Sequence, residues 1–165
     1  MKFFKLLLCS AIFFSSCYVN RGNNAHTSVL GGPSNGKSLF AEMQIDKVKK
    51  IGEPLILKFT VYNQADSTQQ FCKWHTPFEP LMSKYLEIKD EHGVEMLYQG
   101  AMAKRMMPPP ESSYIKVNTK GSVSATVDLA KAFAINKPSR YTITYTGQDM
   151  SGVIVKSSAT FDYVK

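Results

Sequence analysis

Cysteine is scarce in this sequence, and the positions of the few cysteines exclude a disulfide framework. Only three cysteines occur in 165 residues. Cys9 lies in an apolar N-terminal run and Cys17 lies just after it, so Cys72 alone remains in the part expected to fold. A single thiol cannot form an internal disulfide. The folded part must therefore be stabilised by an ordinary hydrophobic core.

The N-terminal apolar run is too short to cross a bilayer. It covers residues 6–14, follows Lys2 and Lys5, and ends before two serines. A membrane-spanning helix needs about 20 apolar residues. A basic start, a short apolar run and small residues before a cleavage site are typical of a secretory signal peptide. We predict that residues 1–16 are such a peptide, removed after Ser16.

The position of Cys17 indicates a bacterial lipoprotein. Lipoprotein processing needs a thiol directly after small residues, and Ser15-Ser16-Cys17 fits, although Phe14 stands where leucine is commoner. Acyl chains contribute roughly 0.8 kcal/mol per buried methylene, and stable anchoring takes more than one chain. We expect a lipidated Cys17 and a cell-envelope location outside the cytoplasm, on the periplasmic or cell-surface face. The alternative is an ordinary signal peptide with an incidental cysteine.

Basic residues are not clustered. The net charge of +7 falls to +5 when Lys2 and Lys5 are removed, with 18 basic against 13 acidic residues left. The basic residues occur singly or in pairs, such as Lys49-Lys50 and Lys104-Arg105. A nucleic-acid site needs a clustered basic stripe. We therefore expect no nucleic-acid partner.

Residues 17–37 are rich in Asn, Gly, Ser and Thr, which predicts a flexible tether that begins at the lipidated cysteine. At its end, Gly31–Ser38 (GGPSNGKS) matches the phosphate-binding pattern G-x-x-x-x-G-K-[ST]. That loop binds phosphate only between a buried strand and a helix N-terminus. Residues 39–46 instead alternate with the period of a strand. We expect no nucleotide site.

The sequence carries no metalloprotease motif. It has no H-E-x-x-H, and its three histidines (His26, His75 and His92) lack paired ligand spacing. Cys72 and His75 are three residues apart, which places them on opposite faces of a strand. Cys72 is therefore expected to be a small buried hydrophobic residue. We expect no enzyme activity, no catalytic residues, no metal and no cofactor.

Beyond the tether the dominant hydrophobic period is two, which is typical of β-strands. Residues 38–165 are therefore predicted to be one all-β domain, an immunoglobulin-like antiparallel β-sandwich of about eight or nine short strands. One short helical turn is expected at residues 129–134, with Asp128 as its N-cap. Tyr141 lies where a tyrosine corner would occur.

Residues 71–111 form the least regular stretch and contain the candidate partner-binding residues. Trp74 is expected to be a core anchor between the sheets. Phe78 and its neighbours either close one end of the sandwich or form a contact patch. The proline-rich loop at residues 101–110 is either a rigid crossover or an exposed polyproline II binding edge. The candidate residues are Trp74, His75, Thr76, Pro77, Phe78, Lys104, Arg105, Pro108 and Pro109.

A series of short motifs follows one order along residues 39–147. They are W-H-T-P-F-E at 74–79, Y-L-E-I at 85–88, Gly93, Y-Q-G at 98–100, Lys104-Arg105, Pro109, S-V-S-A-T-V-D-L at 122–129 and Y-T-I-T-Y at 141–145. In these motifs the chain resembles the N-terminal propeptide-type domain of bacterial deuterolysin and peptidyl-Lys metalloendopeptidase relatives, the aspzincin proteases. The catalytic half of that family, with its H-E-x-x-H, is missing from this sequence.

The resemblance implies a protease-associated domain without proteolytic activity. Such a domain could bind a secreted zinc metalloprotease and inhibit or chaperone it in trans. Two alternatives remain open. One is a surface immunoglobulin-like adhesion or carbohydrate-binding module, with Tyr62, Tyr85 and Tyr114 as possible exposed aromatics. The other is a truncated relic of a protease.

Overall fold

The computed structural model describes residues 38–165. The expected signal peptide 1–16, the lipidated Cys17, the tether 17–37 and all of the Gly31–Ser38 pattern except Ser38 lie outside the described residues. The segment after Ser38 is a strand, β1 (Leu39–Gln44), and not the helix that a phosphate-binding loop requires.

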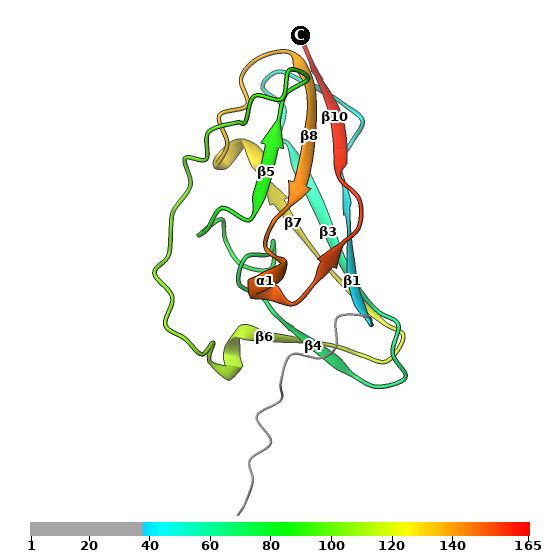
Figure 1. The fold of residues 1–165 in the computed structure, drawn as a ribbon. Helices are drawn as coiled ribbons and strands as arrows, with labels where there is room; N and C mark the ends of the chain where they lie inside the picture. The colour runs from blue at the N-terminus through cyan, green and yellow to red at the C-terminus, as the bar shows by residue number, and fades with distance from the viewer. Residues whose placement is uncertain (1–37) are drawn as a thin grey trace, which may run out of the picture. The chain divides into compact units, whose positions relative to one another are not determined.

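Two four-stranded sheets form the sandwich, as Figure 1 shows. The first sheet has the order β7 (Ser122–Asp128), β3 (Ile56–Asn63), β1, β9 (Ile154–Val155). The second has the order β2 (Val48–Lys50), β10 (Ala159–Val164), β8 (Ser139–Tyr145), β5 (Leu86–Lys89). Most pairs are antiparallel, while β9 and β2 join their sheets in parallel. This confirms the predicted all-β sandwich.

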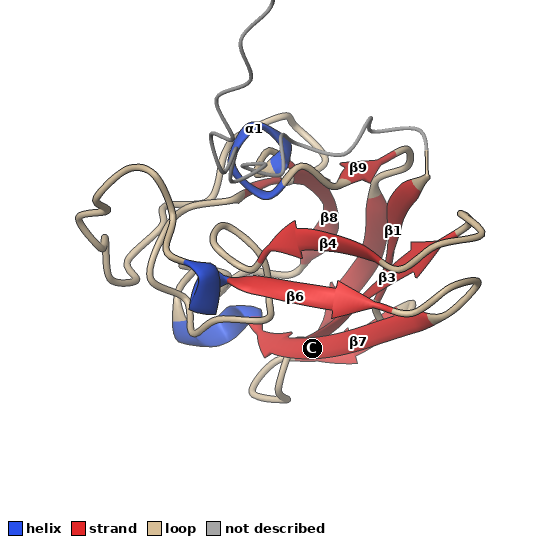
Figure 2. Ribbon diagram, turned by 90° about the horizontal axis from the view of Figure 1, so that it is seen from below, coloured by secondary structure: helices blue, strands red, loops and turns tan. Residues whose placement is uncertain are grey.

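A third, two-stranded sheet covers one end of the first (Figure 2). It pairs β4 (Gln69–Cys72) with β6 (Tyr114–Val117). Phe71 of β4 and Val117 of β6 pack in one hydrophobic cluster with Phe59 and Val61 of β3. The described residues thus contain ten strands, slightly more than predicted, because two of them have only two and three residues.

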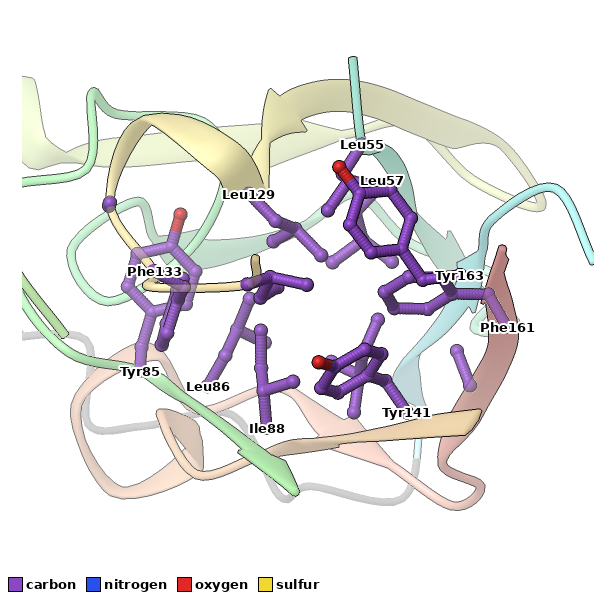
Figure 3. Close-up of a cluster of buried hydrophobic side chains, with 14 residues drawn as sticks. Leu55, Leu57, Tyr85, Leu86, Ile88, Leu129, Phe133, Tyr141, Phe161 and Tyr163 are labelled. Atoms are coloured by element: carbon purple, nitrogen blue, oxygen red, sulfur yellow. The ribbon is translucent and has the colours of Figure 1, made fainter. Parts of the chain in front are cut away.

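Alternation along the strands explains the core. In β3, Leu57, Phe59 and Val61 are buried because every second side chain points inward. The larger of two hydrophobic clusters lies between the sheets and is shown in Figure 3. It contains Leu55, Leu57, Tyr85, Leu86, Ile88, Leu129, Ala132, Phe133, Ile135, Tyr141, Ile143, Ala159, Phe161 and Tyr163.

The expected helical turn and tyrosine corner are present. Residues Leu129–Lys131 form a short 3-10 turn, η2, and the Asp128 side chain accepts a hydrogen bond from the Ala130 N–H. The turn is shorter than predicted. Two further short pieces, η1 (Glu111–Ser113) and α1 (Gln148–Ser151), were not expected. The Tyr141 hydroxyl donates to the Lys137 carbonyl at 2.9 Å, which is the upstream bond of a tyrosine corner.

The sequence predicts a hairpin that turns at Asp90–Gly93, because Val94, Met96 and Tyr98 alternate as in a returning strand, but that strand is not formed. The turn is present, since Gly93 has φ of 80° and its N–H donates to the Asp90 carbonyl at 3.0 Å. The returning residues 94–98 make only isolated bridges, at Glu95 and Tyr98. Val94 and Leu97 remain exposed. Met96 and Tyr98 do pack against the main core cluster, but the backbone of this segment pairs only at isolated positions, so the apolar alternation does not form a strand.

Candidate functional site

The structure brings the two predicted binding segments together. Arg105, in loop 101–110, donates to both carboxylate oxygens of Glu79 at 2.8 and 2.7 Å. The Glu79 side chain is only 6% exposed, and that of Arg105 is 19% exposed. Both bonds come from one guanidinium nitrogen, Nη2, and such charge-assisted hydrogen bonds between buried groups are strong. Arg105 therefore anchors the proline-rich loop to the turn that follows β4.

Hydrogen bonds within the 73–79 turn place Glu79 for this role. The fully buried Thr76 hydroxyl donates to the Lys73 carbonyl at 2.6 Å and accepts from the Phe78 N–H at 3.2 Å. Glu79 accepts from the His75 N–H at 3.0 Å. His75 has φ of 60°, a left-handed conformation that reverses the chain. The W-H-T-P-F-E motif therefore forms one compact turn.

Trp74 is buried, but not where it was expected. Its exposed fraction is 7%, yet it belongs to neither hydrophobic cluster. The Arg105 guanidinium instead lies 4.8 Å from the centroid of its ring. A cation over an indole face is attracted by the electron density of the ring. Trp74 is therefore a support for Arg105 and not an anchor between the sheets.

The turn below the loop is tied to the sandwich through Tyr145. Its hydroxyl lies 2.9 Å from the His75 carbonyl oxygen and 2.7 Å from the Ser151 hydroxyl. Because a carbonyl can only accept, the Tyr145 proton goes to His75. A Cβ at the neighbouring Gly147 would lie 2.4 Å from the same carbonyl oxygen, so only glycine fits there. The 73–79 turn is thus bonded to Tyr145 of the sandwich and to Arg105 of loop 101–110.

The loop exposes methionines on either side of its anchor. Met102 is 72% exposed, Met106 86% and Met107 66%. The Ala103 N–H donates to the Met82 carbonyl at 2.7 Å, which fixes the first half of the loop. Pro110 has φ of −65° and ψ of 158°, in the polyproline II region, and the Met107-Pro108 bond is cis. A large apolar surface on an ordered loop is a feature of interaction sites.

The predicted site residues divide into support and surface. Trp74, Thr76 and Pro77 are buried, and His75 and Phe78 are half-buried. Phe78 packs against Phe71 with ring centroids 5.1 Å apart, so it closes the sandwich end and is not a contact patch. Lys104 and Pro108 are exposed, while Arg105 and Pro109 are half-buried.

Sequence reasoning missed Glu79 and the methionines as members of this site. Arg105 and Glu79 are 26 residues apart, and no pattern links them without the fold. The methionines did leave a signal, because three of the eight in the chain lie within six residues of a proline-rich segment. The sequence analysis assigned them no role.

Cys72 and His75 do not form a reactive pair. Cys72 is buried, and burial raises the pKa of its thiol. Burial lowers the pKa of His75, against a smaller opposing effect of Glu79. Both groups are thus neutral at pH 7, as suits packed side chains. Among residues 38–165, no three side chains of the metal-binding types gather in one place.

The aromatics considered for sugar binding do not share a face. Tyr85 is 1% exposed and belongs to the main core cluster. Tyr114 is on the small β4–β6 sheet. Tyr62 lies on the outer face of β3 and stacks on Phe40 of β1, with ring centroids 5.1 Å apart. Among residues 38–165, only Tyr62 and Phe40 form an aromatic pair on an open sheet face.

Comparison with known proteins identifies the family. The model of an immunoglobulin-like domain family matches residues 42–159. The chain belongs to this family. No curated protein matches. Nothing in the comparisons links the chain to deuterolysin propeptides, so that resemblance rests on the sequence motifs alone.

One similar solved structure is the alkylpurine DNA glycosylase AlkC of Pseudomonas fluorescens, bound to DNA containing an abasic site analog. The identity is 11% and the TM-score 0.39, over 78% of this chain. The chain spans 31% of the length of that protein. A likeness this slight supports no conclusion about fold or function. Within residues 38–165, no helix has the length and apolar character that a membrane crossing would need.

Proposed function

We propose that this protein is a non-catalytic binding module that presents loop 101–110 to a protein partner. The observation that carries the proposal is the anchoring of Arg105 by Glu79 and Trp74, which leaves Met102, Met106 and Met107 exposed on an ordered loop. An ordered loop has little conformational entropy left to lose on binding. Methionine side chains adapt to an apolar partner surface.

The partner suggested by the motif resemblance is a secreted zinc endopeptidase, which the domain would inhibit or chaperone. In this proposal loop 101–110 covers the substrate cleft of the protease. Lys104, exposed beside the anchor, would face solvent or an acidic rim of the cleft. Affinity would come from a few well-packed apolar contacts and not from total area.

The test is a titration of the chain into a deuterolysin-type zinc endopeptidase while peptide hydrolysis is followed. We expect saturable inhibition, and at least a tenfold weaker effect from the double variant Met106→Ser/Met107→Ser. Leu97→Ser is the matched control, because Leu97 is also exposed and apolar but lies outside the loop. Rapid digestion of the chain without inhibition would reject the protease partner. Equal inhibition by the double variant would reject the loop.

We propose further that Cys17 carries a lipid anchor. The support is the sequence alone: a short apolar run, two serines and a cysteine. Fatty-acid labelling of growing cells should label the wild-type protein and leave the Cys17→Ser variant unlabelled. The variant should also leave the membrane fraction. Equal labelling of both proteins would reject the anchor.

A carbohydrate-binding surface is the second candidate. It is favoured by the Tyr62–Phe40 stack on the outer face of the first sheet, because sugar rings pack on exposed aromatics. A glycan array should then give a signal that Tyr62→Ala abolishes. The absence of any glycan signal would leave loop 101–110 as the better candidate for the binding surface.

A further inference from the structure

Strand β7 is an open edge of the first sheet. It is the terminal strand in the order β7-β3-β1-β9 and pairs only with β3. Asn63 N–H donates to the Gly121 carbonyl and Leu129 N–H to the Leu55 carbonyl, both at 2.9 Å. These two bonds fix the phase of the ladder, in which odd-numbered residues of β7 bond to β3.

The even-numbered residues of β7 therefore point their backbone groups away from the sheet. In an antiparallel ladder, hydrogen-bonded and non-hydrogen-bonded pairs alternate. The residues concerned are Ser122, Ser124, Thr126 and Asp128. Within residues 38–165 none of their backbone N–H or C=O groups has a partner in another strand or loop. An extended chain could bond to all of them.

This edge lacks the features that normally protect an exposed strand. Native edges carry lysine, proline or a bulge, or are very short. β2 carries two lysines, β9 has only two residues, and β5 is partly covered through the bond from Met96 N–H to the Ile88 carbonyl. β7 has seven residues, S-V-S-A-T-V-D, in unbroken register with β3. An unprotected edge of this length is suited to strand addition.

The inward side chains of β7 also remain incompletely covered. Val123, Ala125 and Val127 point toward the core, but each is only half-buried. Val123 packs against one hydrophobic cluster and Val127 against the other. A strand added beside β7 would cover the open sides of these three residues.

We propose that the added strand is β7 of a second copy of this chain, antiparallel and related by a two-fold axis at Ala125. The residue types of β7 are symmetric about Ala125. A hydroxyl residue lies on each side of it, followed outward by a valine and then by a polar residue. In this register Ser124 faces Thr126 of the second copy and Ser122 faces its Asp128. These are the hydrogen-bonded pairs, so every outward backbone group is satisfied and no like charges meet.

The same register places apolar residues together on the inner face. Val123 packs beside Val127 of the second copy, and Ala125 faces its own counterpart. Pairs of β-branched residues, and hydroxyl pairs such as Ser124 with Thr126, stabilise antiparallel strands. The interface is isologous, so it closes after two copies. The first sheet of one copy and the first sheet of the other then form one continuous sheet.

A cysteine at the axis tests the register. Directly opposed residues in a non-hydrogen-bonded pair have Cα atoms about 4.5 Å apart, within the range of about 4.4–6.8 Å for disulfides. The full chain bearing Ala125→Cys, extracted in mild detergent and treated with a mild oxidant, should form a disulfide-linked dimer. The wild-type chain measures any contribution of the native cysteines.

Val123→Cys is the matched control, because residue 123 would face residue 127 and not its own counterpart. Val123→Cys chains alone should form no disulfide-linked dimer, whereas an equal mixture of Val123→Cys and Val127→Cys chains should crosslink. Equal crosslinking of the Ala125→Cys and Val123→Cys chains would overturn the proposal. So would an Ala125→Cys chain that forms no disulfide-linked dimer or that crosslinks to a different protein.

A second variant separates loss of pairing from loss of folding. Thr126→Pro removes an N–H that points away from β3, so the native ladder keeps its bonds, and edge strands accept proline. Added to Ala125→Cys, it should reduce the crosslink at least tenfold while circular dichroism and the unfolding transition remain those of a folded domain. A folded variant that crosslinks as before would overturn the proposed strand pairing.

Discussion

At the scale of single residues, Arg105 has the largest consequence. Replacing it with alanine leaves the buried Glu79 carboxylate without its partner and Trp74 without its cover. Breaking a buried ion pair is strongly destabilising, and since Arg105 is partly exposed we expect a loss of about 2–3 kcal/mol in unfolding free energy. Urea unfolding of the variant and of the wild type measures this loss.

Two controls show whether the geometry of Arg105 matters. Lys104→Ala removes the neighbouring exposed charge and should change stability by less than about 0.5 kcal/mol. Arg105→Lys keeps the charge but loses the planar guanidinium that lies over Trp74, so its stability should fall between those of the other two variants. A lysine variant as stable as the wild type would show that the charge alone suffices.

Tyr85 and Tyr145 are both largely buried, but their hydroxyl groups differ. The Tyr85 hydroxyl has no hydrogen-bond partner within residues 38–165, whereas that of Tyr145 donates to the His75 carbonyl. At neutral pH, Tyr85→Phe should be neutral or stabilise by up to about 1 kcal/mol, and Tyr145→Phe should cost about 1–2 kcal/mol. Thermal unfolding of the two variants tests this contrast.

The same tyrosines predict a loss of stability in alkaline solution. Burial raises the pKa of both hydroxyls above the ordinary value. The unfolded chain therefore releases these protons first, near pH 10, while the folded chain still holds them. Below pH 10 the contribution is constant. Above pH 10, the unfolding free energy should fall by about 1.4 kcal/mol per pH unit for each tyrosine. The Tyr85→Phe substitution should remove the part of this slope that Tyr85 contributes.

At the scale of elements, Asn63 joins the small sheet to the end of β3. Its side-chain N–H groups donate to the carbonyls of Ser67, Val117 and Asn118 at 2.8 to 3.0 Å, and its oxygen accepts from Ala65 N–H. Asn63→Ala leaves these buried groups unpaired and should cost about 3 kcal/mol.

Hydrogen exchange locates the effect of this substitution. Amides of β4 and β6 should exchange faster in Asn63→Ala, since the link between these strands and β3 is lost. Asn118→Ala is a suitable control, because that side chain is exposed and should change stability by less than about 0.5 kcal/mol. Uniformly faster exchange across all strands would contradict a local role for Asn63.

Elements with a buried face were predictable from the sequence, and elements without one were not. β3 and β8 follow the alternation of their apolar residues, and η2 follows its Asp128 cap. Residues 94–98 alternate equally well but pair with β5 at only a few positions, so the pattern predicted a strand that is not formed. The parallel pairing of β9 and β2 depends on contacts between distant segments, which no local pattern encodes.

The candidate site was predictable as a region but not as an arrangement. Lys104-Arg105 and the W-H-T-P-F-E motif lie apart in the sequence, and the structure joins the two segments. Which member of each segment faces solvent depends on the Arg105–Glu79 pair. Because that pair links residues 26 apart in the chain, the sequence did not reveal that Trp74 packs against Arg105 of the loop.

At the scale of the whole domain, the two hydrophobic clusters share residues. Met43 and Tyr145 pack against both of them. We therefore expect residues 38–165 to unfold in one cooperative transition, with a calorimetric enthalpy equal to the van't Hoff enthalpy. Two separate transitions would show that the clusters fold independently.

The methionines of loop 101–110 also make the protein sensitive to oxidants. A thioether that lies in solvent is readily converted to the sulfoxide, which is polar and no longer suits an apolar contact. Met102, Met106 and Met107 are far more exposed than Met43 or Met96. Hydrogen peroxide should therefore modify these three first while the sandwich remains folded, and methionine sulfoxide reductase should reverse the change. The surface proposed to bind a partner would then also respond to oxidative stress.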